Sequence, residues 1–359
     1  MKRLLTLLIL FVLANNLFGQ SHSINNFVDS FAKKSNFNGT ILIQQKSKVS
    51  YQKGFGLANF QFKVRTKIDT KYKIASITKL FTSVLILQLY EKGKLDLNKT
   101  IKNYLPGYKG GGADTITVHQ LLNHTSGMAN IDTITSIESV LKDGAPVYQK
   151  PRTSDELLTT YCSGNLINEP GKVFSYNNAE YIILGKIIEG ICNKSYEQAL
   201  KENILQPLGM KNSGLLYQQN IVDDLANTYF YREDIKKLAP DLPVYPENWY
   251  AAGSMYSTTN DLLKFSNALF KLKLLKQETL SEMLTPGLDE YGYGTWVYKN
   301  FETNNKKYTI IKRPGEIMGT QTLLIHVLGE DITIIILNNT GTAGLEDFAA
   351  EIVKRSATW

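Results

Sequence analysis

The sequence has few residues of the kinds that bind metals, with 2 cysteines and 4 histidines among 359 residues. It contains no H-E-x-x-H pattern and no cysteine pairs at zinc-binding spacing, so no metal site is expected. The P-loop and G-x-G-x-x-G patterns are also missing, which leaves no signal for a nucleotide cofactor. No cofactor is therefore predicted. Of the histidines, His124 is expected to organise its turn by hydrogen bonding rather than to react.

The two cysteines, Cys162 and Cys192, leave the redox chemistry open. In an oxidising compartment they can form a disulfide. A disulfide requires Cα atoms within about 7 Å of each other, and the sequence does not show that distance. One disulfide and two separate thiols are both compatible with the sequence.

Charge of one sign does not dominate, since 40 Lys and Arg stand against 33 Asp and Glu, for a formal net charge of +7. The basic residues are scattered, and no helix-turn-helix or RNP pattern appears, so nucleic acid is not an expected partner. Hydrophobic residues make up 43% of the chain. That share is ordinary for a globular protein with a sizeable core.

Residues 1–20 have the composition of a secretory signal peptide. Lys2 and Arg3 precede an apolar run at residues 4–13, and small residues follow it. The run is too short to span a bilayer comfortably, so no stable membrane span is expected. We predict that residues 21–359 form a single domain that is exported to a bacterial periplasm or secreted.

The most informative stretch is the S-x-x-K tetrad that begins at Ser76 and ends at Lys79. It follows a predicted extended run at residues 72–74 and opens an apolar helix over residues 80–90. Positions i and i+3 share one face of a helix. The Lys79 amine can therefore take the proton of the Ser76 hydroxyl as that oxygen attacks a carbonyl. This pairing predicts a covalent acyl-enzyme.

The tetrad alone is not decisive, because Ser30, Ser50 and Ser139 also begin an S-x-x-K match. None of these three serines opens a strongly apolar helix. A purely structural role for Ser76, as the N-cap of its helix, stays open. That role does not explain why a charged Lys79 stands in a helix whose composition is otherwise that of a buried one.

Two further segments supply polar groups. A Tyr-x-Asn triplet, Tyr176 to Asn178, follows a Pro-Gly loop and precedes a second apolar helix. Near the C-terminus, Arg313 and Gly315 lie between two β-rich runs. A second Tyr-x-Asn triplet, which begins at Tyr298, has neither the preceding loop nor the following helix, and we interpret it as incidental.

The order of these motifs resembles the serine β-lactamase and penicillin-binding-protein superfamily. Its tyrosine version resembles the class C β-lactamase-related branch, which includes D,D-peptidases, aminopeptidases and esterases. The resemblance extends from about residue 39 to the C-terminus. Further segments that resemble the family stand in the same order at residues 53–59, 118–128, 206–210 and 251–262.

The resemblance implies a role for each matching residue near the nucleophile. Ser76 would be the nucleophile, and Lys79 would be the first candidate for its base. Tyr176 would either accept the serine proton or relay it to the leaving group. Asn178 would hydrogen-bond both the substrate and Lys79.

The resemblance also implies a substrate-binding edge. The oxyanion hole would consist of the backbone N–H groups of Ser76 and Glu316, and Gly315 would let the substrate lie along the strand. Arg313 is a departure, because the family usually has lysine or histidine there. Arginine is effectively never neutral, but it can bind a carboxylate with two hydrogen bonds. With Pro314, which lacks an N–H, this departure argues against efficient β-lactamase activity.

The expected fold is α/β (α+β), of the β-lactamase/transpeptidase-like type. An antiparallel sheet from both chain ends would be flanked by helices and joined to a mainly helical lobe. The α/β lobe would comprise about residues 21–75 and 285–359, and the helical lobe about residues 76–284. The resemblance places the active site in the cleft between them.

The leading interpretation is a secreted serine hydrolase that cleaves a peptide, amide or ester bond through a Ser76 acyl-enzyme. Its partner would be a small-molecule or peptide substrate, with cell-wall fragments among the candidates. A catalytically inactive envelope-binding protein on the same fold and a true class C β-lactamase are the alternatives. A conventional Ser-His-Asp esterase is disfavoured because the chain has no G-x-S-x-G.

Overall fold

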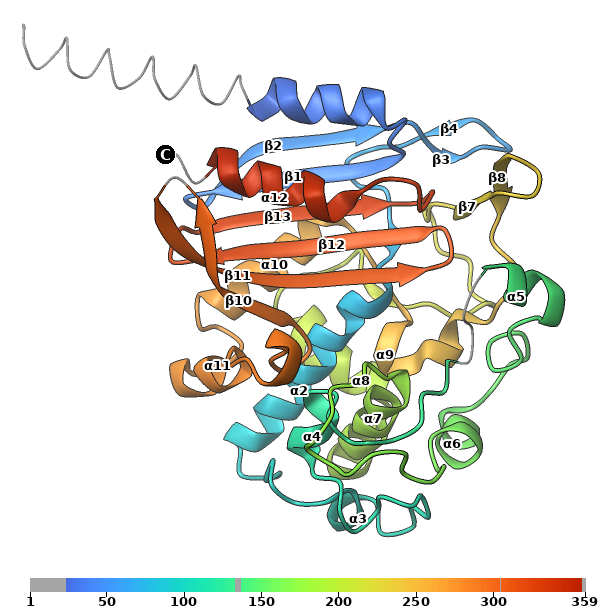
Figure 1. Ribbon diagram of the computed structural model, residues 1–359, viewed down its shortest axis with the longest axis vertical. Helices are drawn as coiled ribbons and strands as arrows, with labels where there is room; N and C mark the ends of the chain where they lie inside the picture. Colours follow the sequence, from blue (N-terminus) through green and yellow to red (C-terminus); the bar gives the residue numbers. More distant parts are fainter. Residues whose placement is uncertain (1–23, 133–136, 304, 357–359) are drawn as a thin grey trace, which may run out of the picture.

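A six-stranded antiparallel sheet forms one half of the molecule in the computed structural model, which describes residues 24–132, 137–303 and 305–356 (Figure 1). The strand order is β10-β11-β12-β13-β1-β2. The strands are β1 (Gly39–Gln45), β2 (Lys48–Phe55), β10 (Trp296–Thr303), β11 (Lys306–Ile317), β12 (Thr320–Leu328) and β13 (Ile332–Asn338). Because β1 pairs with β13, both ends of the chain share one sheet, as predicted. The predicted signal peptide at residues 1–20 lies outside the described residues.

The central strands send side chains into two separate cores, because successive residues of a strand point to opposite faces. On β13, Ile334 packs into a cluster with the helix at residues 24–34 and with α12 (Leu345–Ser356). Its neighbour Ile335 joins the core of the helical half. Since both faces of the sheet are covered, residues 332–337 are mostly apolar and show no polar alternation.

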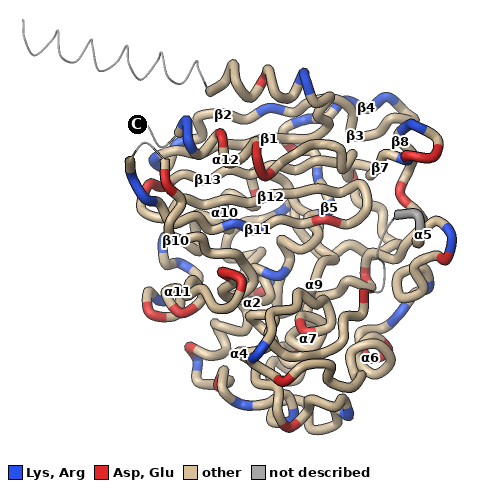
Figure 2. The backbone as a smooth tube through the Cα atoms, viewed as in Figure 1, with Lys and Arg blue, Asp and Glu red and all other residues tan. Residues whose placement is uncertain are grey.

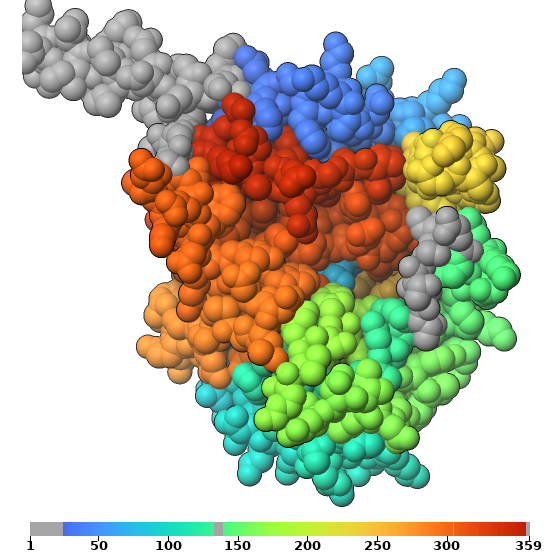
Figure 3. Space-filling view, viewed as in Figure 1, coloured from blue at the N-terminus to red at the C-terminus, as the bar shows by residue number. Residues whose placement is uncertain are grey.

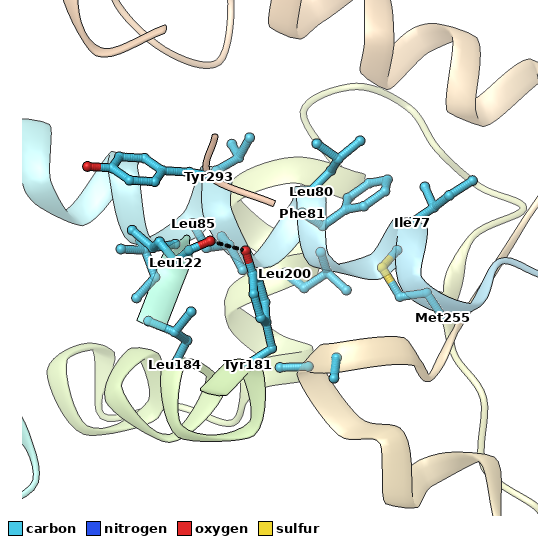
Figure 4. Close-up of a cluster of buried hydrophobic side chains, with 14 of the residues drawn as sticks. Ile77, Leu80, Phe81, Leu85, Leu122, Tyr181, Leu184, Leu200, Met255 and Tyr293 are labelled. Atoms are coloured by element: carbon cyan, nitrogen blue, oxygen red, sulfur yellow. Dashed lines mark hydrogen bonds between the residues drawn. The ribbon is translucent and has the colours of Figure 1, made fainter. Parts of the chain in front are cut away.

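The helical half is organised around α2 (Thr78–Glu91), which is buried along most of its length. α2 packs against α7 (Asn178–Cys192) and α9 (Tyr250–Gly253). Figure 4 shows apolar side chains from this region pointing toward one another. Among these side chains, the Tyr181 hydroxyl donates to the Leu122 carbonyl oxygen at 2.9 Å. A helix that is apolar on nearly every side is typical of such an interior position.

The remaining elements are short, apart from α10, which packs against β13 and β1. The helices are α3 (Ile101–Tyr104), α4 (Val118–Leu122), α5 (Ile137–Asp143), α6 (Ser154–Glu156), α8 (Tyr196–Leu200), α10 (Thr259–Phe270) and α11 (Gln277–Met283). The minor strands are β3 (Leu57–Asn59), β4 (Val64–Arg65), β5 (Tyr72–Lys73), β6 (Gly214–Leu215), β7 (Tyr229–Arg232), β8 (Lys237–Pro240) and β9 (Met255–Ser257).

β11 continues further than the sequence predicts. Arg313 and Gly315 were expected between two strands, whereas both lie within β11, because pairing with β12 continues as far as Ile317. Pairing with β10 already stops at Lys312. The end of β11 therefore has a sheet partner on one side only. An open edge of this kind tolerates Pro314, which cannot donate a ladder hydrogen bond.

The structure shows whether the two cysteines are paired and how the basic residues are distributed. Cys162 and Cys192 are separate thiols, the first buried and the second partly exposed. Lys and Arg are scattered over the periphery in Figure 2 rather than gathered in one patch. Among the described helices, none has both the length and the apolar composition needed to cross a membrane. The predicted lobe boundaries near residues 75 and 285 stay a prediction.

Candidate active site

Ser76 lies in the 3-10 turn η1 (Ala75–Ile77), between β5 and α2. Ala75 has a φ of 46°, a region that residues with a Cβ rarely adopt, so the chain turns sharply just before the serine. The N-cap of α2 is Ile77, and no side chain caps the helix. The N-cap interpretation of Ser76 is therefore wrong, and its hydroxyl is available for other partners.

A hollow in the surface leads to this turn. Figure 3 shows light-blue atoms from this part of the chain at the bottom of a depression, between the red C-terminal strands and the yellow-green segment that precedes α7. Ser76 itself is half-buried, whereas its neighbours Ala75 and Ile77 are buried. Ser76 thus stays partly exposed on a turn whose neighbouring residues are buried.

Two predicted residues contact the Ser76 hydroxyl, and a third, Asn178, holds one of them. The Tyr176 hydroxyl donates to Ser76 Oγ at 2.7 Å, and Lys79 Nζ donates to the same oxygen at 3.1 Å. Lys79 Nζ also donates to Asn178 Oδ1 at 2.6 Å and to the Ala252 carbonyl at 3.0 Å. These bonds hold the amine of a fully buried lysine against the serine.

The Tyr176 loop is held in place by the residue that follows it. Asn177 is the N-cap of α7, and its side chain accepts a hydrogen bond from Ala179 N at 2.9 Å. Its amide group donates to the carbonyl oxygens of Met128 and Ala129. Tyr176 therefore stands just outside the helix and Asn178 just inside it, so both are fixed by one cap.

Arg313 lies beneath Tyr176 and is only 1% exposed. Its Nε donates to the Ser76 carbonyl oxygen at 2.7 Å. Its two terminal nitrogens donate to the hydroxyls of Tyr291, at 2.7 Å, and Tyr176, at 2.5 Å. Three of the five N–H donors of the guanidinium are thereby used within the protein. The structure turns Arg313 toward the tyrosine rather than toward the open cleft, where a substrate carboxylate would lie.

The two cations change the acidity of the groups around the serine. Burial is the largest cause that lowers the pKa of Lys79, and together with Arg313 it brings that pKa to about 8 from 10.5. Burial alone would raise the pKa of Tyr176, but Arg313 and Lys79 together lower it below its ordinary value. Both groups can therefore lose a proton more readily than they would in water.

Gly315 packs directly against the turn that contains the serine. A Cβ at this position would lie 2.5 Å from the Ile74 carbonyl oxygen and 3.0 Å from Ser76 N. Only glycine fits so close to another backbone. The sequence suggested that Gly315 makes room for a substrate, whereas the structure gives a reason within the protein itself. Glu316 follows on the open edge of β11, with an exposed side chain.

A buried acid–base pair below Tyr176 was missed. His124 Nδ1 is hydrogen-bonded to the Glu180 carboxyl group and accepts from Asn177 N at 3.3 Å, while its ring centroid lies 4.4 Å from that of Tyr176. Burial raises the pKa of Glu180 well above its usual range and is the main cause that lowers the pKa of His124. Both shifts favour a neutral pair, in which the proton between Nδ1 and the carboxyl group is shared. His124 reaches into α7, beyond the turn that it was expected to organise.

The segment after His124 contributes a second missed group. Asn178 Nδ2 donates to Asp132 Oδ2 at 2.6 Å, so a carboxylate lies beside the amide that contacts Lys79. No sequence motif includes this aspartate.

The other matches to the two motifs lie on other elements. The alternative S-x-x-K serines are on the helix at residues 24–34 (Ser30), on β2 (Ser50) and on α5 (Ser139), and the second Tyr-x-Asn triplet is on β10 (Tyr298). Over the described ranges, no three His, Cys, Asp or Glu side chains gather as metal ligands.

Comparisons with known proteins match this geometry. The family model described as Beta-lactamase matches residues 24–357. A penicillin-binding protein of Bacillus subtilis (strain 168) is 28% identical over 335 residues, which are 88% of this chain and 71% of that protein. The crystal structure of a penicillin binding protein from Bacillus halodurans is 25% identical with a TM-score of 0.77, and covers 92% of this chain and 98% of its own.

A further solved structure is that of a D-amino acid amidase from Ochrobactrum anthropi SV3, complexed with L-phenylalanine amide. It is 21% identical with a TM-score of 0.77, and the match covers 93% of this chain and 99% of the amidase. At that identity the likeness shows the shared fold. One backbone architecture thus carries proteins that are named for different substrates.

Proposed function

Because the chain belongs to the β-lactamase family, we propose that it is a secreted serine hydrolase that cleaves a peptide, amide or ester bond through an acyl-enzyme on Ser76. The family and fold inferred from the motifs are confirmed by the family model and by the solved relatives. The observation that carries the proposal is the position of the Ser76 hydroxyl between the Tyr176 hydroxyl and the Lys79 amine.

Acylation begins with proton removal from Ser76. Tyr176 is the nearer group, at 2.7 Å, and Arg313 and Lys79 favour its phenolate form. As Ser76 Oγ bonds to the substrate carbonyl carbon, its proton passes to Tyr176 Oη, and the carbonyl oxygen becomes an oxyanion. Lys79 supports this step as a hydrogen-bond donor to both Ser76 and Asn178. Tyr176 then protonates the leaving amine or alcohol as the bond to the carbonyl carbon breaks.

Two backbone N–H groups stabilise the oxyanion, and Tyr176 acts again in the second half-reaction, deacylation. We assign the oxyanion hole to the backbone N–H groups of Ser76 and Glu316, since β11 passes against the Ser76 turn at Gly315. In deacylation a water molecule loses a proton to Tyr176 and attacks the acyl carbon. The proton returns to Ser76 Oγ as the ester bond to the enzyme breaks, which restores the free enzyme.

The site argues against both alternatives, an inactive binding protein and a true class C β-lactamase. An inactive binding protein would not need a serine, a lysine and a tyrosine in mutual hydrogen-bond contact. For a true class C β-lactamase, the committed donors of Arg313 leave no free cation at this position for the carboxylate of a β-lactam. Secretion rests on residues 1–20 and stays a prediction.

The test of the proposed function is covalent labelling. Intact-mass measurement after treatment with a fluorophosphonate should show one adduct, and peptide mapping should place it on Ser76. Ser76→Ala should remove the label and lower the turnover of p-nitrophenyl acetate by on the order of 10⁶-fold, as expected for loss of a nucleophile. Its thermal unfolding should be nearly unchanged, since Ser76 does not cap a helix.

A matched control variant is Ser50→Ala, which removes a serine from another S-x-x-K match, on β2. It should keep both the label and the turnover. A fluorophosphonate adduct on a serine other than Ser76, or Ser76→Ala with wild-type turnover, would exclude the proposed mechanism. Treatment with a penicillin in the same experiment separates a slow acyl-enzyme, seen as a mass increase, from a β-lactamase, which would hydrolyse the drug.

A further inference from the structure

The carboxylate of Asp132 is partly exposed beside Asn178 and has no part in the acyl transfer proposed above. Asp132 is half-buried, and Asp132 N donates to Asn130 Oδ1 at 3.0 Å, which fixes its position. Asn178 Nδ2 donates to Asp132 Oδ2 at 2.6 Å, and Asn178 Oδ1 accepts from Lys79 at 2.6 Å. One amide side chain thus separates this carboxylate from the amine that contacts Ser76.

Asp132 has unused capacity as a hydrogen-bond acceptor. From the described residues it accepts hydrogen bonds from two neutral groups, the Asn178 amide and the Tyr148 hydroxyl. An ionised carboxylate has about four lone-pair sites, so room for further donors remains. Among the ion pairs formed by the described part of the chain, none involves Asp132. A part-buried carboxylate without a cation favours a cationic ligand.

The cations of the site do not compete for that role. Lys79 is fully buried, and Arg313, at 1% exposed, directs three donors to Ser76 and to two tyrosines. The exposed charged side chain that follows Gly315 on β11 is another carboxylate, Glu316. The more exposed charged groups next to these buried cations are therefore two carboxylates, Asp132 and Glu316.

An apolar wall stands beside Asp132. The rings of Tyr148 and Trp249 are stacked, with centroids 3.8 Å apart and planes at 3°. Ile317 and Met318, at the end of β11, pack against the same cluster. Because Tyr148 donates its hydroxyl to Asp132, the carboxylate and the aromatic surface belong to one continuous wall. The two rings are themselves buried, and Ile317 and Met318 are the partly exposed apolar residues of this wall. These two side chains suit a ligand with a positive charge close to an apolar side chain.

We propose that Asp132 is a specificity-determining residue that binds the protonated amino group of the substrate. The preferred substrates are then amides or esters of apolar amino acids or short peptides with a free α-amino group beside the scissile carbonyl. This inference rests on the proposed Ser76 hydrolase activity. It reverses the preference for substrate carboxylates that the sequence suggested through Arg313.

The test compares paired substrates that differ only in charge. Wild-type protein is assayed with the D- and L-phenylalanine p-nitroanilides and with their N-acetyl derivatives, below the α-amino pKa of about 7.7–8.0. A charge-assisted pair predicts that kcat/KM for the free amine exceeds that for the N-acetyl derivative by about 10- to 100-fold for at least one enantiomer. In Asp132→Asn this ratio should fall close to one.

Asp132→Asn is a conservative change, because an amide can accept from Asn178 and donate to the Tyr148 hydroxyl. A matched control is Glu169→Gln, which removes an exposed carboxylate elsewhere in the helical half and should keep the wild-type ratio. If the wild type shows no preference for the free amine, or if Asp132→Asn keeps the preference, Asp132 does not select the substrate. Ser76-dependent hydrolysis of p-nitrophenyl acetate is measured in parallel. If the wild type does not hydrolyse p-nitrophenyl acetate, the proposed function is wrong, and so is this inference.

Discussion

The floor and the rim of the cleft differ in charge and in access to water. At the floor, Lys79 and Arg313 are buried, and their hydrogen-bond partners are hydroxyls, an amide and carbonyl oxygens rather than carboxylates. At the rim, Asp132 is half-buried and Glu316 is exposed. The floor thus concentrates positive charge where water is scarce, while the rim presents negative charge where a substrate arrives.

This difference separates reactivity from selection. Buried cations without carboxylate partners are costly. Here burial, with a contribution from Arg313, lowers the pKa of Lys79, and the two cations lower the pKa of Tyr176. The neutral His124–Glu180 pair keeps a negative charge away from the floor, where it would oppose that shift. Charges at the rim cost less folding free energy than the buried cations, because water screens them.

Among the changes that test this contrast between floor and rim, the largest effect is expected from removing the charge of Arg313. In Arg313→Met the pKa of Tyr176 should rise, because its main opposing cation is gone. Less phenolate is then present at neutral pH, and kcat/KM at pH 7 should fall by on the order of 10²-fold. The acidic limb of the pH–rate profile should move to higher pH, with partial recovery of activity in alkaline solution.

The controls for Arg313 separate its charge from its packing. Tyr291→Phe removes one acceptor of the guanidinium but leaves its charge, and the acidic limb should stay near its wild-type position. Thermal unfolding of both variants shows whether the fold is intact. An Arg313→Met protein that folds, is slow at every pH and has an unmoved acidic limb would contradict the electrostatic role.

A smaller effect, on stability rather than on rate, is expected from Lys79→Met. The pKa of Lys79 is about 8 in the folded protein and 10.5 in the ordinary state, so burial of its charge costs up to about 3 kcal/mol below pH 8. Loss of its hydrogen bonds offsets part of this. The inactive variant should therefore be more stable than the wild type at pH 6, by on the order of 1–2 kcal/mol.

The pH dependence of that gain gives the sharper test. Between about pH 8 and pH 10.5 the unfolded wild type binds more protons at Lys79 than the folded one, so wild-type stability rises with pH relative to the variant. Urea unfolding at pH 6 and pH 10 should show the gain shrinking. The exposed Lys99 provides the control Lys99→Met. A difference between wild type and Lys79→Met that is equal at both pH values would mean that the floor does not destabilise this lysine.

Much of the fold could be predicted from the sequence because its signals are local. The apolar runs at residues 308–311, 320–327 and 332–337 lie in β11, β12 and β13. The i, i+3 spacing also places Lys79 beside Ser76, since three residues make about one helical turn. Periodicity within a short window is sufficient for both predictions.

The rest depends on contacts between distant segments. The direction of Arg313 follows from where the pairing of β10 with β11 ends, at Lys312, and no local pattern encodes that end. His124 and Glu180 are 56 residues apart, and Asp132 meets Asn178 across 46 residues. The acidic Glu180 among apolar residues near the start of α7 is a visible signal. It indicates a buried partner without identifying it.

The smallest expected effect tests the neutral pair beneath the floor. Glu180→Gln copies a protonated carboxyl group, because its amide can donate to His124 Nδ1 while its oxygen accepts from Ser126 N, as Glu180 does at 3.3 Å. We expect kcat/KM to stay within about threefold, less than ~0.7 kcal/mol, and the acidic limb of the pH–rate profile to stay in place. If Glu180 were ionised, its charge would raise the pKa of Tyr176, and the glutamine would move that limb to lower pH. Glu180→Ala, which leaves a cavity and an unpaired His124, should instead unfold at a lower temperature. A shifted limb in Glu180→Gln would show that the floor contains a negative charge, and the contrast with the rim would be weaker than the structure indicates.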